Sequence, residues 1–501
     1  MEVLKALGLT YTFPGQDKPI FTELNFSLEE GEFILLSGES GCGKSTLLNC
    51  LNGVIPHVWQ GQMEGEVLVG GLETTSTSLK ELVQQVGTLW QDVESQLTQL
   101  SVEDELVFGL ENIGLSREES DERLNSVLPL VSLEREASLQ DLSGGQKQRL
   151  ALGALLAMLP RVILLDEPLA NLDLPGAHRF LIFLKELCRQ GKTVLMVEHR
   201  LDLSARYVDR LLYMDQGRIT LDLRNRDRIL QEEALKGNMA GRYPTSFGDR
   251  KAVGEQAAAG KGKGKSTGSF DRPSLELEAL WAAYGKKKVW SGLDLRLEPG
   301  ERLVLLGENG CGKTTFLKLL GGVRRGLKAG YRQFKLLGSP AKKIRKPFYS
   351  RRMGFVMQNP NHQLFMQTVE LEVALNAPGH EEVQNILELF GLEELSGRHP
   401  LSLSQGQKRL LAVAASVAHQ PQILLLDEPT IGQDYNSLQK IIQVLNYLNR
   451  EQGMTIITAT HDRKAAENLG DRALAFKRGE VKILEGREKI GEYWNNISTS
   501  F

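Results

Sequence analysis

The sequence has little of what marks membrane-spanning, disulfide-rich or nucleic-acid-binding chains. It holds four cysteines in 501 residues, and no two of them lie two or three positions apart, which gives neither a zinc spacing nor a disulfide framework. A formal net charge of -3 provides no overall basic field for nucleic acid. No apolar run approaches the roughly 18 residues of a membrane span, and the start lacks the pattern of a signal peptide. We expect a chain that does not enter the bilayer alone and that works in a reducing cytosol.

The sequence does contain the material of ordinary globular domains, and it contains it twice. Hydrophobic residues make up 41% of the chain and charged residues 25%, as in typical folded proteins. Two glycine-rich loops, GESGCGKST and GENGCGKTT, place Lys44 and Lys313 at a distance of 269 positions, and later motifs keep nearly the same offset, such as 261 for Glu167 and Glu428. This small drift indicates a duplication.

The repeat divides the chain into two predicted domains, residues 1–240 and residues 273–501. Residues 241–272 lie between them and are rich in glycine, alanine and lysine without a hydrophobic period. This composition is typical of a flexible tether, and about 30 such residues span on the order of 30 Å.

The glycine-rich loops predict two phosphate-binding sites. In each half an apolar run, residues 33–36 or 303–306, leads into the loop and a helical pattern follows it, which is the context that the GxxxxGK[ST] motif requires. The glycines let backbone N–H groups face the phosphates, the lysine reaches the β and γ groups, and the hydroxyl after the lysine can bind Mg²⁺. The predicted phosphate-binding residues are Gly38, Glu39, Ser40, Gly41, Cys42, Gly43, Lys44, Ser45 and Thr46 in the first loop, and Gly307, Glu308, Asn309, Gly310, Cys311, Gly312, Lys313, Thr314 and Thr315 in the second.

Two later apolar runs, RVILLDEP and QILLLDEP, each end in an Asp-Glu pair. A buried parallel strand presents such carboxylates at its C-terminal edge. Asp166 and Asp427 are therefore predicted to hold Mg²⁺, together with the loop hydroxyls. Glu167 and Glu428 lie one residue further and are predicted to orient or deprotonate an attacking water molecule.

The segments LSGGQKQR (residues 142–149) and LSQGQKRL (residues 403–410) resemble the signature motif of the ATP-binding-cassette superfamily. The resemblance covers nearly the whole chain outside the linker. It implies an α/β fold of two P-loop cassettes, each with a RecA-like core, an inserted helical subdomain that carries the signature, and a β-rich N-terminal portion. It also implies ATP as the ligand, with Mg²⁺. The signature residues are Ser143, Gly144, Gly145 and Gln146 in the first half, and Ser404, Gly406 and Gln407 in the second.

In this superfamily the signature of one domain caps the γ-phosphate that is bound to the other domain, because a helix N-terminus binds anions. The resemblance therefore implies two ATP molecules shared between the halves. The implied groups are Lys44 and Glu167 with Ser404 and Gln407, and Lys313 and Glu428 with Ser143 and Gln146.

Two further pairs match elements of the superfamily. Gln91 and Gln358 resemble the Q-loop glutamine, which implies contacts with the nucleotide and with Mg²⁺. His199 and His461, in VEHR and ATHD, resemble the switch histidine, which makes them catalytic residues beside the two glutamates. A lone histidine after a strand is more often structural, but its place after the carboxylates favours the functional role.

Some positions leave alternatives open. Phe13 and Tyr284 lie where the superfamily stacks adenine on an aromatic ring, although core packing would explain them equally well. Cys42 and Cys311 suggest thiol sensitivity of the loops, whereas a small space-filling residue is the simpler role. Gln405 replaces the first signature glycine in the second half, which predicts two sites that are unequal but both active.

Among tandem ATPases, the chain resembles the ATPase component of an energy-coupling-factor importer, the type that takes up vitamins or transition-metal ions, and this is the class we expect first. The second Q-loop of this chain, QNPNHQLF (residues 358–365), is similar to a QNPDDQLF-like stretch of that group. LNGVIPH (residues 51–57) is similar to a segment of its fused members, although a turn set by Pro56 with an incidental His57 would also explain it. This resemblance implies an ATPase coupled to transmembrane transport, at the cytoplasmic face of the cell membrane. Its partners would be a membrane scaffold, the T-component, and a substrate-binding membrane subunit, and no nucleic acid.

Two other classes carry two such cassettes. The tandem ATPase of a monosaccharide importer usually has a more degraded second half, whereas Glu428 and His461 are both present here. A soluble translation factor that acts on the ribosome has a longer, charged, helical linker.

We also expect Leu97, Leu364 and Phe365, next to the two Q-loops, either to form sockets for helices of the scaffold or to pack in the core.

Overall fold

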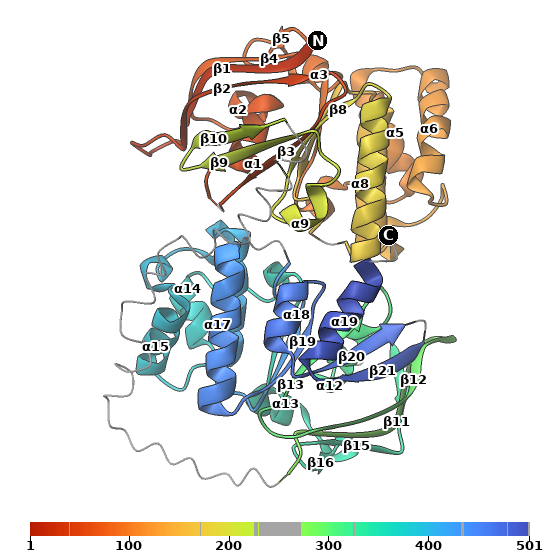
Figure 1. Cartoon of the computed structure of the whole chain (residues 1–501), viewed down its shortest axis with the longest axis vertical. Helices are drawn as coiled ribbons and strands as arrows, with labels where there is room; N and C mark the ends of the chain where they lie inside the picture. The colour runs from red at the N-terminus through yellow and green to blue at the C-terminus, as the bar shows by residue number, and fades with distance from the viewer. Residues whose placement is uncertain are drawn as a thin grey trace. The chain divides into compact units, whose positions relative to one another are not determined.

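The computed structural model describes residues 1–39, 41–170, 172–224, 229, 272–323, 326–431, 435–477 and 479–498. The chain divides into two compact units, Met1–Leu172 with Gly176–Lys263 and Asp173–Pro175 with Gly264–Phe501, called unit 1 and unit 2 below (Figure 1). Residues 241–271 of the predicted linker lie outside the described residues, so the linker and the domain boundaries remain predictions. No helix in the described part of the chain has the length and apolar character that crossing a membrane requires.

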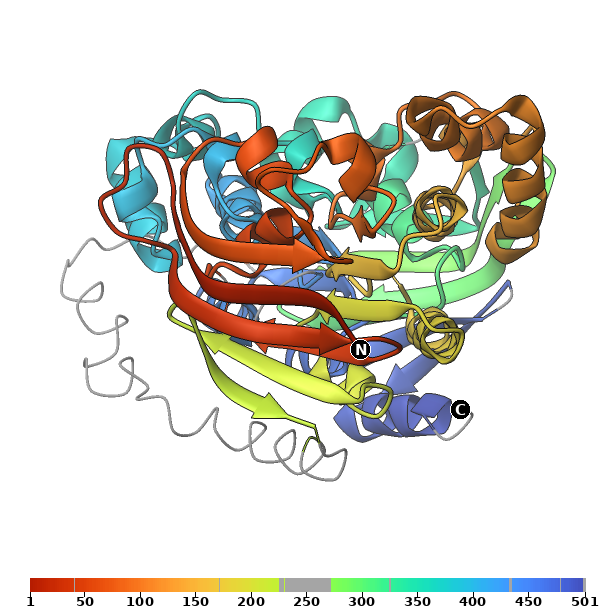
Figure 2. The same cartoon turned by 90° about the horizontal axis from the view of Figure 1, so that it is seen from above.

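Unit 1 contains two sheets, one antiparallel and one mainly parallel. The antiparallel sheet has the strand order β2-β1-β4-β5, and its long curved strands are drawn in red to orange in Figure 2. The second sheet has the order β10-β9-β3-β8-β7-β6 and is parallel except for β10. The strands are β1 (Glu2–Thr12), β2 (Phe21–Glu29), β3 (Phe33–Gly38), β4 (Gln62–Val69), β5 (Leu72–Glu73), β6 (Val86–Leu89), β7 (Val162–Asp166), β8 (Thr193–Val197), β9 (Arg210–Asp215) and β10 (Arg218–Leu223).

The helices of unit 1 include an insert between β6 and β7 that carries the first signature segment. This insert runs from α4 to α7, and α5 and α6 stand to one side of the sheets in Figure 1. The helices are α1 (Lys44–Leu51), α2 (Val54–His57), α3 (Leu79–Leu82), α4 (Val93–Gln96), α5 (Val102–Ile113), α6 (Arg117–Val131), η1 (Leu139–Asp141), α7 (Gly144–Ala157), α8 (Leu174–Arg189) and α9 (Leu201–Ser204).

Unit 2 repeats this plan. Its antiparallel sheet has the order β12-β11-β15-β16, with β14 also paired to β11, and its parallel sheet has the order β17-β18-β19-β13-β20 with β21 added antiparallel. The strands are β11 (Leu275–Tyr284), β12 (Lys287–Leu297), β13 (Arg302–Gly307), β14 (Leu327–Gly330), β15 (Gln333–Leu336), β16 (Ser339–Pro340), β17 (Met353–Val356), β18 (Ile423–Asp427), β19 (Thr455–Ala459), β20 (Arg472–Lys477) and β21 (Glu480–Glu485).

The helical insert of unit 2 lies between β17 and β18 and ends in α16, which carries the second signature segment. The helices of this unit are α12 (Lys313–Leu320), η2 (Ala341–Lys343), α13 (Lys346–Arg352), η3 (Pro360–His362), α14 (Val369–Ala374), α15 (His380–Phe390), η4 (Glu393–Leu395), η5 (Pro400–Ser402), α16 (Gln405–Val417), α17 (Tyr435–Gln452), α18 (Arg463–Leu469) and α19 (Arg487–Ser498).

The continuous apolar runs form strands because the parallel sheet is covered on both faces. In β13, Leu303 and Leu305 pack in the core toward the antiparallel sheet, and Val304 packs in the core toward the helices. Successive side chains of a strand point to opposite faces, so a strand between two cores must be apolar at every position. The predicted strands at residues 33–36 and 303–306, and the two runs that end in Asp-Glu, are confirmed as β3, β13, β7 and β18.

An aromatic cluster joins the layers of unit 2. Phe316 on α12 is fully buried, and its ring centroid lies 6.0 Å from that of Trp290 on β12 and 6.1 Å from that of Phe476 on β20. The three rings connect the antiparallel sheet, the helix after the glycine loop and the parallel sheet. Edge-to-face packing of this kind adds to the free energy of burial.

We predict that Phe316→Ala lowers the free energy of unfolding of unit 2 by about 3–5 kcal/mol, because it leaves a cavity between these layers. Denaturant unfolding of the full chain measures the change. Phe365→Ala is the control, because Phe365 is 68% exposed, and its effect should stay within about 0.5 kcal/mol. Equal effects of the two substitutions would contradict the prediction.

Candidate active sites

The strand order brings four motifs to one edge of each parallel sheet. In unit 1 the adjacent strands β3, β8, β7 and β6 are followed by the glycine loop, His199, Glu167 and Gln91, respectively. In unit 2 the adjacent strands β13, β19, β18 and β17 are followed by the second glycine loop, His461, Glu428 and Gln358. The carboxyl ends of parallel strands form the binding edge of an open α/β sheet. Motifs that are far apart in the sequence thus become neighbours.

The glycine loops need their first glycine for steric reasons. Gly38 has a φ of 156°, and a Cβ there would lie 2.1 Å from the carbonyl oxygen of Met214. Gly307 has a φ of 140°, and a Cβ there would lie 2.5 Å from the carbonyl oxygen of Phe476. Only glycine fits where two backbones approach so closely. Ser40, which belongs to the predicted loop, lies outside the described residues.

The lysines of both loops are buried and held by the loops themselves. Lys44 Nζ donates to the carbonyl oxygens of Gly38 at 3.0 Å and Glu39 at 2.6 Å. Lys313 Nζ donates to Gly307 at 2.7 Å and to Glu308 at 3.1 Å. Each ammonium group is thus positioned at the N-terminus of the helix that follows the loop, where a helix end also favours anions.

In unit 1 three of the predicted residues meet around one carboxylate. Glu167 Oε2 accepts a hydrogen bond from Gln91 Nε2 at 2.6 Å, and Glu167 Oε1 lies 3.1 Å from His199 Nε2. The glutamate side chain is therefore fixed from two sides. This arrangement suits a group that must present one oxygen to a reacting water molecule.

In unit 2 the histidine also contacts the loop lysine. His461 Nε2 lies 3.2 Å from Glu428 Oε1 and 3.1 Å from Lys313 Nζ, and the backbone N–H of His461 donates to Glu428 Oε2 at 3.0 Å. Gln358 is exposed, unlike Gln91, which contacts the glutamate. The two units therefore hold the same residues in different contacts.

Both glutamates have a strained backbone. Glu167 has a φ of 48° and Glu428 a φ of 52°, a region that residues other than glycine rarely adopt. Such strain persists where the surroundings fix it, and it is common at functional sites. The backbone N–H groups of Glu167 and Glu428 donate to the carbonyl oxygens of Val197 and Ala459, each at 3.0 Å, which ties both turns to the neighbouring strand.

Burial changes the acidity of the carboxyl groups. Burial raises the pKa of Asp166 to about 6, and the nearby charge of Glu167 adds to the rise. Burial also raises the pKa of Glu428 to about 7. Burial lowers the pKa of His199, but the hydrogen bond and charge of Glu167 outweigh this effect, so that the pKa is raised overall. Shifts of this size are frequent at functional sites.

The predicted metal ligands of each unit include a hydroxyl and an aspartate that lie together. Thr314 Oγ1 donates to Asp427 Oδ1 at 3.0 Å, and a hydrogen bond from Ser45 lowers the pKa of Asp166 against the effect of burial. Asp166 Oδ1 is buried and has no hydrogen-bond partner among the described residues. Oxygen donors of this kind suit Mg²⁺. No three His, Cys, Asp or Glu side chains form a metal cluster in the described ranges, so Mg²⁺ would also need phosphate or water ligands.

The signature serines cap the helices that follow them. Ser143 N donates to Gln146 Oε1 at 2.9 Å, and Ser404 N donates to Gln407 Oε1 at 3.0 Å, as in a capping box. A Cβ at Gly144 would meet open space, so a larger residue at the equivalent position, Gln405, does not disturb the backbone of α16. Both serines are exposed at a helix N-terminus, where an anion can bind.

The residues with open alternatives take distinct places. Phe13 is half-buried and packs against the Tyr11 ring at 5.1 Å, whereas Tyr284 is 41% exposed on β11. All four cysteines are free thiols, and burial raises the pKa of Cys42 and of Cys311. A raised pKa disfavours the reactive thiolate, which supports the space-filling role of the loop cysteines.

Sequence reasoning missed a buried glutamate that shapes each Q-loop. Glu372 Oε2 accepts hydrogen bonds from the backbone N–H groups of Phe365 at 2.9 Å and Met366 at 2.8 Å. Glu105 Oε2 accepts from the backbone N–H groups of Thr98 and Gln99, both at 2.9 Å. Both glutamates are almost fully buried, and the duplication itself was the signal that could have found them, since they occupy corresponding positions.

Two further groups near the glutamates were also missed. Glu198 is buried beside His199 and accepts from the backbone N–H of Leu169 at 3.2 Å. Arg409 on α16 is buried and donates to the carbonyl oxygen of Glu428. Burial lowers the pKa of Arg409 to about 10, although the charges of Glu428 and Asp427 oppose this effect.

The fold and the paired sites define a class, the P-loop ATPases with two similar nucleotide-binding units. Residues 21–170 and 290–431 match the family model described as ABC transporter. The chain belongs to the ABC transporter family, and it is an ATP-binding subunit of a transporter.

Similar proteins include tandem relatives of nearly equal length. The chain is 34% identical to a Bacillus subtilis (strain 168) protein named "Putative HMP/thiamine import ATP-binding protein YkoD", over 95% of this chain and 90% of that protein. It is 33% identical to a Methanosarcina mazei protein named "Putative ABC transporter ATP-binding protein", over 97% of this chain and 89% of that protein. A solved structure, cbiO1 from Clostridium perfringens, is 28% identical, covers 48% of this chain and 96% of its own chain, and has a TM-score of 0.42.

We predict that hydrolysis by a Glu167→Gln variant, which leaves unit 2 active, falls as the pH is lowered from about 8 to about 6. The reason is that Glu428, the predicted base, would have to be ionised to accept a proton, and burial raises its pKa to about 7. Steady-state phosphate release at saturating ATP measures the dependence of the rate on pH. The midpoint of the fall on the acid side should lie at or somewhat below the pKa of Glu428. A rate that stays constant over this range would contradict the assignment of Glu428 as the base.

Proposed function

We propose that the chain hydrolyses ATP at both units and thereby drives an importer of the energy-coupling-factor type. The observation that carries the ATPase assignment is the meeting of a glutamate, a histidine and a loop lysine at one sheet edge in each unit. In unit 2, His461 Nε2 lies 3.2 Å from Glu428 Oε1 and 3.1 Å from Lys313 Nζ, so the histidine contacts both other groups. Glu167 and His199 form the same pair in unit 1.

Each group has a definite task in this proposal. Glu167 and Glu428 orient the attacking water and accept its proton, and the histidines hold the carboxylates in place. The lysines neutralise the β- and γ-phosphate charge. Ser45 with Asp166, and Thr314 with Asp427, would hold Mg²⁺, which supplies charge neutralisation on the phosphate oxygens when it is bound.

The signature segments complete the proposed sites. As the family resemblance implies, each signature serine, Ser143 or Ser404, would cap the γ-phosphate that is bound to the other half. The glycines that follow each serine in the sequence would take part in this contact. Two ATP molecules would then hold the two halves together in the closed form. The exposed N-termini of α7 and α16 are suited to an anion.

The double variant Glu167→Gln, Glu428→Gln should bind ATP like the parent but hydrolyse it at least about a hundredfold more slowly, because neither amide can accept the proton. Equilibrium binding of a fluorescent ATP analogue and phosphate release measure the two properties. Lys44→Ala with Lys313→Ala is the matched comparison, and it should weaken ATP binding itself. Hydrolysis at the parental rate in the double glutamine variant would exclude these glutamates as bases.

Similarity over nearly the full length of YkoD supports the importer assignment. The name of that protein refers to HMP and thiamine import, and an energy-coupling-factor importer takes up vitamins with separate membrane subunits. We infer that this chain binds a membrane scaffold, the T-component, and through it a substrate-binding subunit, at the cytoplasmic face of the membrane.

The contact with the scaffold is assigned to the surface beside the second Q-loop. Phe365 is 68% exposed, and Leu371 and Leu375, just beyond it, are 48% and 49% exposed. Leu364 is only 5% exposed and belongs to the core of unit 2, which favours core packing, the second of the two alternatives expected for it. Its side chain packs inward because the adjacent residues of the loop are held by Glu372.

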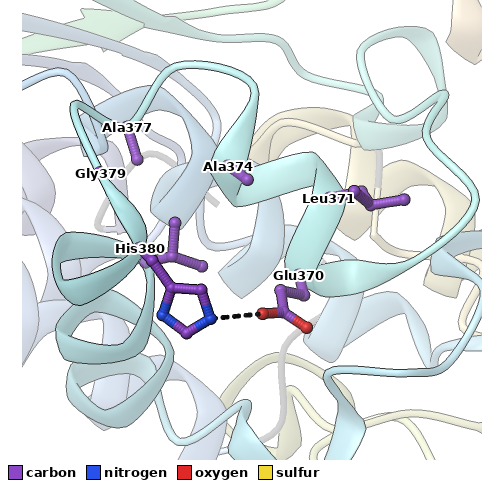
Figure 3. Close-up of a pocket in the computed structure, with 7 residues that line it drawn as sticks. Glu370, Leu371, Ala374, Ala377, Gly379 and His380 are labelled. Atoms are coloured by element: carbon purple, nitrogen blue, oxygen red, sulfur yellow. Dashed lines mark ion pairs between the residues drawn. The ribbon is translucent and has the colours of Figure 1, made fainter.

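A shallow pocket lies next to this surface, between α14 and α15. Figure 3 shows Ala374, Ala377 and the ring of His380 around it, with the ion pair between His380 Nε2 and Glu370 Oε1 at 3.7 Å. Apolar surface that a monomer leaves exposed marks an interaction site. A short helix of the scaffold would cover Leu371 and enter this depression.

Phe365→Glu should abolish co-purification of the chain with its membrane subunits, because a charge replaces the exposed ring. Affinity purification from solubilised membranes, with identification of the co-eluting subunits, tests this. Ile182→Glu is the control, since Ile182 on α8 is 58% exposed and far in sequence from either Q-loop. Unchanged co-purification, or association of the parent with ribosomes, would contradict the proposal.

A further inference from the structure

The sequence of unit 2 contains a long stretch without a single acidic residue. Between Glu308 and Glu370 lie 61 residues with no Asp or Glu and with thirteen Lys or Arg. The corresponding stretch of unit 1, residues 40–102, has six acidic residues and two basic ones. The two units share one fold, so the fold does not require this charge difference.

Residues 342–352, in the second half of this stretch, are called the basic segment here. It includes most of η2 and all of α13, between β16 and β17, and η2 packs against β15. Figure 1 labels α13, β15 and β16. Alternation of apolar and basic residues orders it. Ala341, Ile344, Phe348 and Tyr349 pack into the core between the two sheets of unit 2.

The cations of the basic segment whose side chains the structure describes are exposed. Its exposed cations, without ion pairs to any described residue, are Lys342, Lys343, Arg345, Arg351 and Arg352. Two cations at or next to β15 behave differently. Arg332 pairs with Glu278 at 2.8 Å, and Lys335 pairs with Glu276 at 3.5 Å.

A cluster of unpaired cations on one ordered segment is costly to keep together unless an external anion compensates it. Among the residues that the structure describes, no side chain holds any of the five, so these cations lack the fixed geometry with which a protein recognises one particular anion. Long, freely oriented Lys and Arg side chains match a fluid anionic surface instead, in which the headgroups adjust to them.

We propose that the basic segment is an electrostatic contact with anionic phospholipid headgroups of the membrane. This inference rests on the proposed function in one respect, namely that the chain works at a membrane face. The basic segment would then hold unit 2 at the lipid surface, whereas residues 75–85, which correspond to it in unit 1, carry one Lys and one Glu and would make no such contact. The contact would be separate from the apolar surface at Phe365.

The test uses the purified full-length chain without any membrane subunit. Its binding is measured by co-sedimentation with vesicles of phosphatidylcholine containing about 30% phosphatidylglycerol, and with vesicles of phosphatidylcholine alone. We expect binding to the anionic vesicles only, weakening as salt screens the charges. Each cation near the surface contributes about fivefold, or ~1 kcal/mol, so the triple variant Lys342→Gln, Lys343→Gln, Arg351→Gln should bind about a hundredfold more weakly.

The matched control removes three other exposed cations of unit 2, with the same change in net charge. Lys477→Gln, Lys482→Gln and Lys489→Gln together should change vesicle binding by less than about threefold. All six lysines and arginines are exposed, so the thermal midpoints of both variants should match the parent, and so should their ATP hydrolysis.

Three results would overturn the proposal. These are equal binding to neutral vesicles, equal losses in the two triple variants, and tighter binding of the parent to single-stranded oligouridine than to the anionic vesicles. The last result would assign the segment to nucleic acid. If the chain does not bind anionic vesicles, co-purification with the membrane subunits through Phe365 is unaffected. If that co-purification fails, vesicle binding can still be measured. The lipid contact and the scaffold contact are therefore tested separately.

Discussion

Hydrogen bonding between four adjacent parallel strands is the constraint on which both sites depend. Because β3, β8, β7 and β6 run in one direction and lie side by side, the turns after them meet at a single edge. In the register of the sheet, Val197 lies beside Leu36 on one strand and beside Asp166 on the other, so the strand ends are level. The lysine loop, the carboxylates and the histidine then need no further element to bring them together.

The two units have the same strand arrangement, but the residues at the sheet edge make different contacts. Gln91 holds the glutamate of unit 1, whereas in unit 2 the histidine lies between the glutamate and Lys313. Nε2 of His461 can accept from the lysine or donate to the carboxylate, but a single nitrogen cannot do both with one proton state. The two sites thus share the glutamate, the histidine and the loop lysine, but these residues make different contacts in the two units.

Much of the architecture was predictable from sequence, and the exceptions have physical causes. Apolar runs that end in Asp-Glu predicted buried parallel strands, since only such strands are apolar at successive positions and acidic at the end. The pairing of Gln91 with Glu167 was not predictable, because side-chain rotamers set it. Leu364 and Phe365 are adjacent and similarly apolar, yet one is buried and the other is exposed. Composition cannot separate them, because the turn fixed by Glu372 decides which side chain faces inward.

The sequence alone determined the duplication, the two phosphate loops with their lysines, the paired carboxylates and the signature segments, because these depend on residue type and spacing. Tertiary structure decided three other matters. It placed Glu167 and Glu428 in a strained backbone conformation, it buried Glu428 enough to raise its pKa to about 7, and it left five cations of the basic segment exposed, without an ion pair to any residue that the structure describes. Each of these depends on which distant segments pack against a residue, and spacing along one chain does not carry that information.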